Sequence, residues 1–358
     1  MKITRLRTEV VHIPFNPVIG HALRSADCVL AWLETDEGLV GEGWVCTLNE
    51  QRTGVIRAMV DSLSPLVVGL DPELGGAFSK SAWADTGFIG SAGVTAMGIA
   101  AVDCALWDLR GKAANMNVSR LIGACATAVP VYNSGGLWAS RSIDELQRQA
   151  ADHVKAGYRA MKVRLPRSLP DAVARVRAVR EAIGPEIALM ADPHQLYTVP
   201  EAIRLGRMLE EFNLAWFEEP VDAADHVGEA AVAAALDTPI AAGESVYTAR
   251  DIHEMLRLKS ADILMPDLQR MGGPTEFLKA AHLAECYNIP ISPHHLHQMS
   301  LALVAAIPNA IWLEYMPWFD PLFADGITLD AEGRAIVPTR PGWGYEFDPA
   351  AVKRLRVT

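Results

Sequence analysis

Short apolar runs alternate with amphipathic stretches through the middle and later part of the chain. The runs that we interpret as strands are Val129–Tyr132, Ala160–Val163, Ile187–Ala191, Ala215–Phe217, Ile240–Ala242, Ile263–Met265, Ile289–Ser292 and Ile311–Leu313. Segments with a helical period lie between them, for example Ser142–Ala156 and Pro170–Ile183. Strands that alternate with helices pair in parallel, and a right-handed succession of them can close into a barrel. The pattern therefore predicts an α/β fold built as a (β/α)8-type barrel.

The chain on either side of this repeat has a different pattern. Residues 3–11, 28–35 and 39–44 alternate polar and apolar positions as antiparallel strands do, and residues 49–117 have a helical period. At 358 residues the chain also exceeds the usual size of one domain. We expect an α+β domain in residues 1–125, the barrel in 126–318, and a C-terminal segment, 319–358, that returns to the first domain.

Three carboxylates each follow an apolar run: Asp192 in LMADPHQ, Glu218 in WFEEP and Glu244 in AAGES. The two intervals between them are both 26 residues, a step that suits one strand, one helix and two loops of a barrel. Carboxylates at successive strand ends would converge on one face and repel one another unless a cation lay between them. Because oxygen ligands suit a hard ion, we expect a Mg²⁺ site. Three unrelated surface acids are the alternative, which the even spacing disfavours.

Further titratable residues stand at the ends of other candidate strands. Asp267 follows LMP, His294 follows ISP and Glu314 follows IWL. Lys162 and Arg164 close the second candidate strand, where alternation places them on one face. An isolated histidine is usually structural, but His294 has an aspartate one strand earlier that could orient it. Its unperturbed pKa near neutrality would then suit a general base.

The order of the motifs KxR, ADxH, FEEP, GES, MPD, SPHH and LEY resembles the enolase superfamily, specifically the mandelate racemase subgroup, over nearly the whole chain. The resemblance implies an α+β capping domain, built from both termini, over a modified (β/α)8 TIM-type barrel. It also implies that the three carboxylates bind Mg²⁺, that His294 and Asp267 form a catalytic dyad, and that Glu314 contacts the substrate. Enzymes of this kind remove the proton beside a carboxylate, and the metal stabilises the enediolate.

Two residues favour dehydration over racemisation. A racemase would place a base on each face of the substrate carbon, whereas an arginine such as Arg164 gives up a proton poorly and is a better carboxylate clamp than a base. His194 is expected to share the inward face of its strand with Asp192, and several sugar-acid dehydratases of the superfamily use a histidine at this place. A structural histidine is the competing interpretation.

The hypothesis is therefore an enzyme that dehydrates an acid sugar, either an aldonic or an aldaric acid, to a 2-keto-3-deoxy acid. A racemase, epimerase or cycloisomerase acting through the same enediolate is the alternative. A non-catalytic descendant of the family is disfavoured because the set of ligand and dyad residues is complete.

Substrate contacts are less well determined by the sequence. Phe15–Ser25 contains two prolines and a glycine, which indicates a long loop of the kind that often carries function. His21 and Arg24 in this segment, and Asn133 with Ser134 after the first barrel strand, are candidate contacts to the small-molecule carboxylate substrate. For His21 and Arg24 the alternative is that both side chains are simply solvated.

Composition sets the remaining expectations. The chain is 50% hydrophobic and 21% charged, as is ordinary for a soluble enzyme, and its net charge of −11 argues against a nucleic-acid partner. No apolar stretch approaches the roughly 18 residues that span a bilayer, so we expect no membrane partner. Five scattered cysteines without CxxC spacing fit a reducing cytoplasm. The family resemblance suggests a homo-oligomer.

Overall fold

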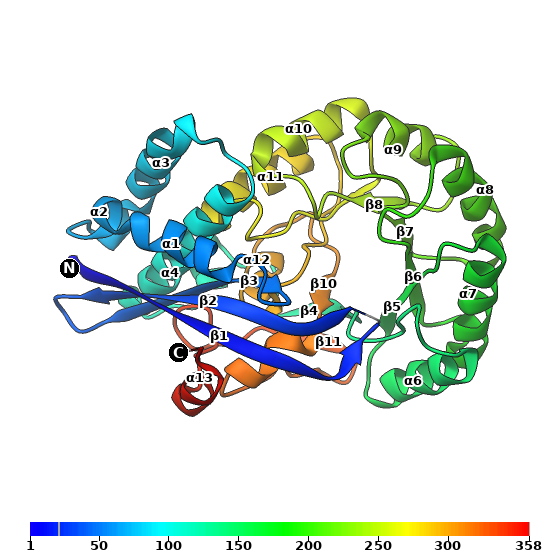
Figure 1. The fold of residues 1–358 in the computed structure, drawn as a ribbon, viewed down its shortest axis with the longest axis horizontal. Coiled ribbons are helices and arrows are strands. Elements are labelled where there is room, and N and C mark those ends of the chain that lie inside the picture. The colour runs from blue at the N-terminus through cyan, green and yellow to red at the C-terminus, as the bar shows by residue number, and fades with distance from the viewer. Residues whose placement is uncertain (21, 358) are drawn as a thin grey trace.

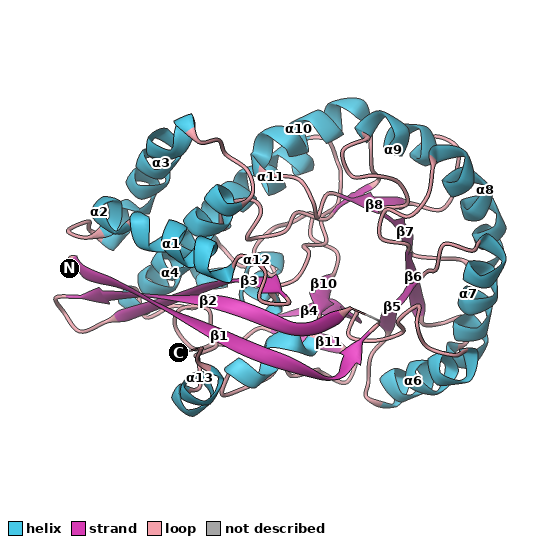
Figure 2. Cartoon of the chain, viewed as in Figure 1, coloured by secondary structure: helices cyan, strands magenta, loops and turns pink. Residues whose placement is uncertain are grey.

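A computed structural model describes residues 1–20 and 22–357 of the chain. It begins with an antiparallel sheet in the order β1 (Ile3–Ile19), β2 (Leu23–Thr35) and β3 (Val40–Leu48). Figures 1 and 2 show helices α1 to α4 gathered at one end of the molecule, and helices α6 to α10 arrayed around a curled sheet at the other. The α+β unit and the barrel-type unit predicted from the sequence are both present.

The segment Phe15–Ser25 differs from the prediction, because most of it is strand and not loop. β1 continues to Ile19 and β2 begins at Leu23, with a register irregularity between Pro14 and Ile19 where the pairing with β2 is interrupted. Proline is tolerated in an extended segment of this kind at the edge of a sheet or at an irregularity. His21, one of the predicted substrate contacts, lies outside the described residues.

The helices of the first unit pack on one face of its sheet. Their bounds are α1 (Thr53–Ser62), α2 (Ser64–Val67), η1 (Pro72–Leu74), α3 (Gly75–Asp85), η2 (Thr86–Phe88), α4 (Val94–Ala113) and α5 (Val118–Ile122). α4 is rich in small residues and lies so close to β3 that a Cβ on Gly41 would come within 2.2 Å of the Ala105 carbonyl oxygen. Glycine at this position therefore permits the close contact between helix and sheet.

Asp103 and Asp108 interrupt the apolar face of α4, and both are buried. The Asp103 carboxylate accepts hydrogen bonds from the backbone and the hydroxyl of Thr275, each at 2.8 Å. Asp108 accepts the backbone N–H groups of Glu42 and Trp343, at 2.8 and 2.9 Å, and pairs with Lys112 at 2.6 Å. Both acids therefore tie the first unit to later parts of the chain.

A curled parallel sheet in the order β10-β4-β5-β6-β7-β8-β9 forms the second unit. Its strands are β4 (Ala128–Asn133), β5 (Ala160–Arg164), β6 (Ala188–Asp192), β7 (Trp216–Glu218), β8 (Ile240–Ala242), β9 (Ile263–Leu264) and β10 (Leu313–Tyr315). The helices are α6 (Ile143–Lys155), α7 (Leu169–Ile183), α8 (Val199–Leu209), η3 (Glu210–Phe212), α9 (His226–Ala233), α10 (Thr248–Leu258), α11 (Pro274–Cys286) and α12 (His297–Val304). Seven of the eight predicted strands are therefore present, and Ser142 caps α6 as expected.

The predicted strand Ile289–Ser292 is the exception. Only isolated bridges connect Ile291 to Leu264 on one side and to Ala310 on the other. This stretch contains Pro290, which lacks an N–H group to donate to a neighbouring strand, so an extended ladder does not form. The bridges nevertheless place the residues after Ile291 beside the end of β9.

The C-terminal residues form η4 (Pro317–Leu322), β11 (Arg334–Ile336) and α13 (Pro349–Leu355). They contact the first unit, because Val11 bridges to Arg356 and the Trp343 indole donates to the Cys104 carbonyl at 3.0 Å. Among the described residues no single helix is long and apolar enough to cross a membrane. The segments Thr53–Val67 and Pro72–Phe88 pass that test only as a pair bent by 117°, by length and composition alone.

Candidate active site

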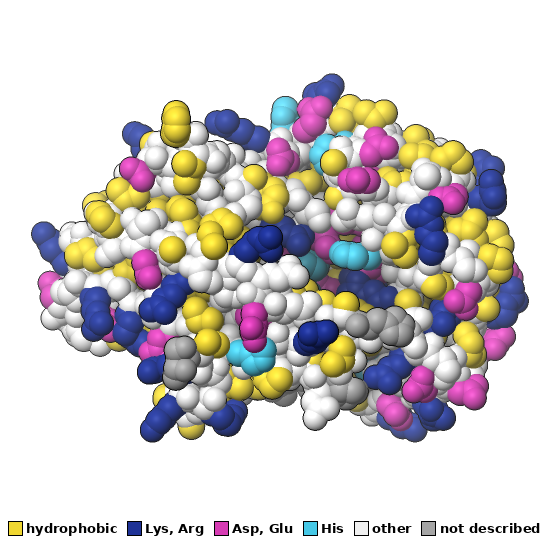
Figure 3. Space-filling model, in the orientation of Figure 1, with side chains coloured by type: hydrophobic (Ala, Val, Ile, Leu, Met, Phe, Trp, Pro, Cys, Tyr) yellow, Lys and Arg dark blue, Asp and Glu magenta, His cyan; other side chains and the backbone are white. Residues whose placement is uncertain are grey.

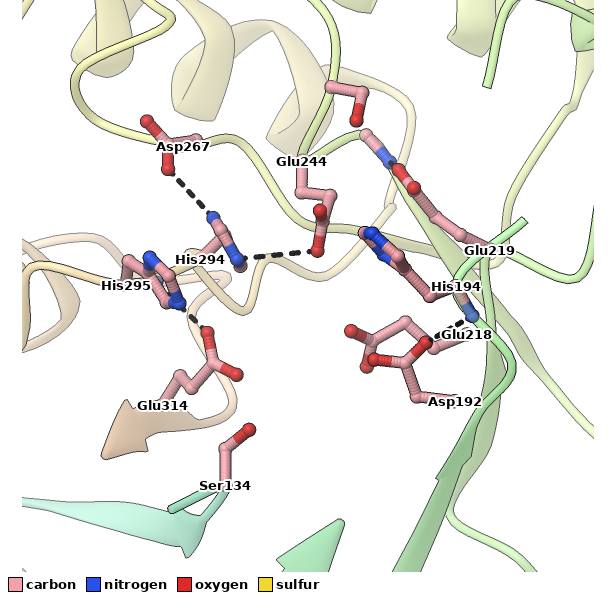
Figure 4. Close-up of polar contacts among 12 residues, drawn as sticks. Ser134, Asp192, His194, Glu218, Glu219, Glu244, Asp267, His294, His295 and Glu314 are labelled. Carbon is pink, nitrogen blue, oxygen red and sulfur yellow. Dashed lines mark hydrogen bonds and ion pairs between the residues drawn. The ribbon is translucent and has the colours of Figure 1, made fainter. Parts of the chain in front are cut away.

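The three spaced carboxylates lie at the carboxyl ends of neighbouring strands (Figure 4). Asp192 ends β6, Glu218 ends β7, and Glu244 follows β8 after Gly243. Gly243 has a φ of 116°, a conformation that glycine adopts without strain and that turns the chain after the strand. Asp192, Glu218 and Glu244 are 2%, 0% and 5% exposed. Burying three anions so deeply requires compensating positive charge.

Lys162 and Arg164 at the end of β5 supply part of that charge. Lys162 is fully buried, and its Nζ contacts Glu218, lies 3.0 Å from Glu314 Oε1 and lies 3.4 Å from Asp192 Oδ2. Arg164 contacts Asp192 and donates to the Ser134 hydroxyl at 3.1 Å. The two residues share one face of their strand, as alternation predicted.

Each predicted ligand is paired with a cation, and the three are not drawn into one compact cluster. Among the described residues, compact groups of possible metal ligands, with ligand atoms all within 4.8 Å of one another, are formed by Asp267–His294–His295 and by His12–Asp27–Glu50. The three spaced carboxylates do not form such a group. Glu244 lies 3.3 Å from His294 Nε2 and 3.7 Å from Arg270. Electrostatics explain this arrangement, because a cation beside each carboxylate stabilises it more than proximity to another anion does.

His294 and Asp267 come together as a buried pair. His294 Nδ1 is 2.7 Å from Asp267 Oδ2, and the backbone N–H groups of Gln269 and Arg270 donate to Asp267 Oδ1 at 2.9 Å. A backbone bridge between the two residues sets the pair in place, although neither residue lies in a regular strand. The other ring nitrogen of His294 faces Glu244, so its Nε2 atom points toward the carboxylates, as Figure 4 shows.

The charges around His294 control its protonation. Burial lowers its pKa, but Glu244, the hydrogen bond to Asp267 and Glu314 outweigh burial and raise the pKa to about 9. Burial would raise the pKa of Asp267, yet the His294 bond and charge hold it below its usual range. Because the Glu244 charge is the largest contribution that favours the imidazolium, neutralising Glu244 would return His294 toward the neutral form that accepts a proton.

His194 also lies beside this group of residues, although not for the reason predicted. The strand ends at Asp192, and His194 has a φ of 54°, so simple strand alternation does not apply to it. Its backbone N–H donates to Asp192 Oδ1 at 2.7 Å, which fixes the turn. The imidazole lies next to Glu244 in Figure 4, and the residue is exposed to solvent. Partial burial, together with Arg164, His294 and Lys162, lowers its pKa against the opposing effect of Glu244.

Two other acids occupy different positions. Glu314, in β10, is fully buried and accepts the His295 backbone N–H at 2.9 Å. Burial opposes the charge of Glu314, but Lys162, His294 and His295 hold its pKa well below the usual value. Glu219, beside Glu218, accepts from Gln195 at 2.5 Å and from the Gly243 N–H at 3.2 Å. Glu219 therefore supports neighbouring loops and does not join the group around Lys162.

The predicted substrate contacts beyond this group have partners within the protein or lie at the surface. The Asn133 side chain accepts the Gly135 N–H at 2.9 Å and lies 3.3 Å from His153, so it holds the turn after β4. Ser134, next in sequence, is the residue that contacts Arg164. Arg24 is exposed, and its backbone N–H donates to Asn49 at 2.8 Å, but no described contact connects its side chain to the group of residues around Lys162.

Sequence reasoning missed Arg270 and two stacked tryptophans, Trp138 and Trp318, beside Arg164. The Arg270 guanidinium donates to the Glu244 carbonyl at 2.5 Å and to the Ser245 hydroxyl at 3.3 Å. Trp138 lies under Arg164 at 5.3 Å and stacks on Trp318 at 6.0 Å. Arg270 follows Asp267 by three residues, so a search for cations just beyond each strand end would have found it.

The chemistry of the buried acids fits a hard divalent cation. All three offer only oxygen atoms, and the buried Asp192 Oδ2 forms ion pairs with Arg164 and Lys162, so it lies where positive charge is favoured. Burial opposes the charge of Glu244, but His294, Arg270 and Lys162 lower its pKa to about 2, so it is an anion near neutral pH. Carboxylate oxygens are the ligands that Mg²⁺ prefers, and Asp192, Glu218 and Glu244 would hold it. Figure 3 shows acidic, basic and histidine side chains gathered in a hollow on the viewed face.

Comparison with known proteins agrees with this geometry. Residues 2–123 match a family model described as the mandelate racemase / muconate lactonizing enzyme N-terminal domain, and residues 145–351 match one described as enolase C-terminal domain-like. The chain is 32% identical to the L-talarate/galactarate dehydratase of Salmonella typhimurium over 92% of its own length and 83% of that protein. It is 31% identical to the 3,6-anhydro-alpha-L-galactonate cycloisomerase of Streptomyces coelicolor over 99% of both.

A solved structure extends the similarity to three dimensions. The L-talarate dehydratase from Polaromonas sp. JS666, complexed with Mg and L-glucarate, superimposes on the chain with a TM-score of 0.93 at 33% identity. The match covers 100% of this chain and 98% of that one. That dehydratase was thus crystallised with both a metal ion and an acid-sugar ligand.

Proposed function

This chain belongs to the mandelate racemase subgroup of the enolase superfamily, and from that membership we propose that it is a Mg²⁺-dependent hydro-lyase that dehydrates an acid sugar. The substrate would be an aldonic or aldaric acid, and the product a 2-keto-3-deoxy acid. The observation that carries the proposal is the His294–Asp267 pair. Its reactive nitrogen faces a buried group of acids and cations at the carboxyl ends of the strands.

His294 is the base in this proposal. Its Nε2 atom takes the proton from the carbon next to the substrate carboxylate. Asp267 accepts from Nδ1, so it fixes the tautomer and stabilises the imidazolium that forms. Stabilisation of this kind contributes when the charge appears on the ring during proton transfer.

The substrate carboxylate would lie among the cationic side chains. A divalent cation bound by Asp192, Glu218 and Glu244 would withdraw negative charge from the substrate carboxylate oxygens as the proton leaves. Arg164, stacked on Trp138, presents a planar fork suited to a carboxylate. Lys162 lies beside these oxygens, where its Nζ contacts Glu218, Glu314 and Asp192.

Elimination then requires an acid near the β-hydroxyl. His194 lies on the other side of Glu244 from His294 in Figure 4, so either histidine could deliver a proton to the leaving hydroxyl, depending on which face it leaves from. The C–O bond breaks, the hydroxyl departs as water, and the resulting enol tautomerises to the 2-keto acid. Glu314 is proposed to contact the substrate; His21, Arg24 and Asn133 remain weaker candidates.

Racemisation or cycloisomerisation is the second candidate, favoured by the full-length similarity to a cycloisomerase. A racemase of this subgroup needs a second base, which the second barrel strand is expected to supply, and in this chain that strand carries Lys162 and Arg164. Lys162 is fully buried and its Nζ is engaged by three acids, and the guanidinium of Arg164 contacts Asp192, so neither side chain is free to act as a base. This geometry favours elimination.

The experiment is a screen of acid sugars with purified protein and Mg²⁺, in which 2-keto acids are detected chemically. At least one aldonic or aldaric acid is expected to give a 2-keto-3-deoxy acid, and EDTA is expected to abolish the product. If no member reacts, or if substrate is recovered with inverted configuration and no keto acid, dehydration is the wrong assignment.

Three further assignments belong to the same proposal. We place the domain boundaries after residues 125 and 318, which limited proteolysis would test. We assign the chain to the cytoplasm, supported by five free cysteines, and cell fractionation would test it. We expect a homo-oligomer, supported by Phe88 and Ile89, adjacent apolar residues that are 101% and 68% exposed. Light scattering of the wild-type chain and of F88D would test that assignment.

A further inference from the structure

Strand β7 carries three large residues whose directions alternate. Trp216 and Glu218 are two positions apart and share the face that points into the curled sheet, whereas Phe217 points outward to the helices. Trp216 belongs to a cluster of residues enclosed by the sheet, which includes Tyr132, Met190 and Met265. The indole therefore lies directly beneath the carboxylate of Glu218.

A hydrogen bond joins these two side chains. Trp216 Nε1 donates to Glu218 Oε2 at 2.8 Å, and both residues are 0% exposed. An N–H group that donates to a carboxylate makes a stronger bond than one that donates to a neutral acceptor, and the lack of solvent strengthens it further. Indole has no acceptor with which to compete, so this contact fixes one oxygen of Glu218 in one direction.

The other oxygen and the indole ring are also held. Glu218 Oε1 contacts Lys162, so the carboxylate is anchored from two sides. Tyr132 packs edge-on against the indole, with ring centroids 5.1 Å apart and an interplanar angle of 87°, and the same tyrosine ring lies 5.6 Å from Lys162 Nζ. Tyr132 thus supports both residues that hold Glu218.

We propose that Trp216 is a positioning residue for the divalent-cation site, because its indole N–H orients the carboxylate of Glu218 that would bind the ion. The inference rests on the proposed function, which assigns Glu218 as a ligand. Outer contacts that orient metal ligands commonly change metal affinity or activity about 10- to 100-fold when they are removed. Trp216 is 0% exposed and lies out of reach of a substrate, so its loss should act on the metal site and not on proton transfer.

The test is W216F, which keeps an aromatic ring but removes the N–H group. Metal-free protein is titrated with Mn²⁺, and free Mn²⁺ is measured by electron paramagnetic resonance, a readout that does not depend on activity. We expect the dissociation constant to rise at least about tenfold. In the activity assay the Mg²⁺ concentration for half-maximal rate should rise similarly, while kcat at saturating Mg²⁺ stays within about threefold.

W44F is the matched control. Trp44 is 2% exposed, and its Nε1 has no hydrogen-bond partner among the described residues, so this change removes an equally buried indole elsewhere. W44F should bind Mn²⁺ as the wild-type chain does. If W216F is folded and also binds Mn²⁺ within twofold of the wild type, the positioning role is wrong.

A second measurement covers the case in which W216F does not fold. In the wild-type chain with ¹⁵N-labelled indoles, the Trp216 resonance, assigned through its contact with the Tyr132 ring, should shift when Mg²⁺ is added. A resonance that stays fixed at saturating Mg²⁺ would refute the inference. A wild-type chain that binds neither Mn²⁺ nor Mg²⁺ would instead refute the proposed function, so the two failures are distinguishable.

Discussion

Replacing Asp103 by Asn should remove a pH-dependent loss of stability from the fold. Asp103, on α4, is 1% exposed and caps the start of α11 through the backbone and hydroxyl of Thr275. Burial raises its pKa to about 6, against the opposing effect of both Thr275 bonds. The contact joins the first unit of the fold to the barrel, so its stability bears on how the two are held together.

The sign follows from the direction of the shift. The folded chain holds the Asp103 proton more tightly than the unfolded chain, in which the pKa is about 3.8. Stability is therefore lost as pH rises from about 4 to about 6. A shift from 3.8 to about 6 corresponds to roughly 3 kcal/mol at neutral pH, an order-of-magnitude figure.

Asn preserves the contacts while removing the charge. The Asn oxygen can accept the Thr275 N–H, and the Asn amide can donate to the Thr275 hydroxyl oxygen. That hydroxyl oxygen already accepts from Trp107 at 3.0 Å and has a second acceptor site. The unfolding free energy of D103N should therefore exceed that of the wild type by about 1 kcal/mol at pH 4.5 and by about 3 kcal/mol at pH 7.5. D103A, which leaves the Thr275 N–H unsatisfied, should lose about 1–3 kcal/mol relative to D103N at either pH.

Urea unfolding followed by tryptophan fluorescence at a series of pH values measures these differences. The comparison of the two chains cancels the titration of all other groups that the mutation does not touch. A wild-type minus D103N difference that is constant from pH 4.5 to 7.5 would show that Asp103 is not the titrating group. A lower stability of D103N at pH 7.5 would show that the charge itself strengthens the contact.

Three further changes test other parts of the structure. D267N should lower kcat about 10³- to 10⁴-fold without unfolding the chain, because the amide favours the wrong His294 tautomer. Steady-state kinetics measure the loss and circular dichroism checks the fold. A loss of kcat under tenfold would argue against the dyad. R164K should raise KM for the acid sugar about tenfold, since lysine lacks the planar fork that stacks on Trp138, and a change confined to kcat would contradict the clamp role. G273A should lower stability by about 1–3 kcal/mol in thermal unfolding, because Gly273 has a φ of 103° and a Cβ there would lie 2.7 Å from Asp103. An unchanged Tm would mean that the backbone and Asp103 move apart without cost.

Much of the fold was predictable because its signals repeat along the sequence. Seven of the predicted strands were found close to their expected positions, since each is a short apolar run and all but the last are followed by a helix. The even spacing of Asp192, Glu218 and Glu244 correctly predicted neighbouring strand ends. The spacing could not predict that Lys162 and His294 would contact these acids. Which side chains come within reach of one another depends on how the strands pair, and that pairing is a long-range property of the fold.

The errors arose where the backbone leaves the regular period. His194 lies in a left-handed turn after β6, and the alternation of side chains along a strand does not predict where a side chain in such a turn points. β1 continues past two prolines to Ile19 because pairing with β2 resumes after an irregularity, a long-range contact that local composition does not reveal.

The rate of α-proton loss in H294N tests the central claim most directly. An acid sugar identified in the screen is incubated in D2O with Mg²⁺ and either the wild-type or the variant chain, and its α-proton is followed by NMR. We predict that the wild type removes the proton as the 2-keto-3-deoxy acid forms, and that folded H294N, with the same metal affinity, removes it at least about 10³-fold more slowly. Proton loss at the wild-type rate in H294N would show that another residue is the base and contradict the proposed site.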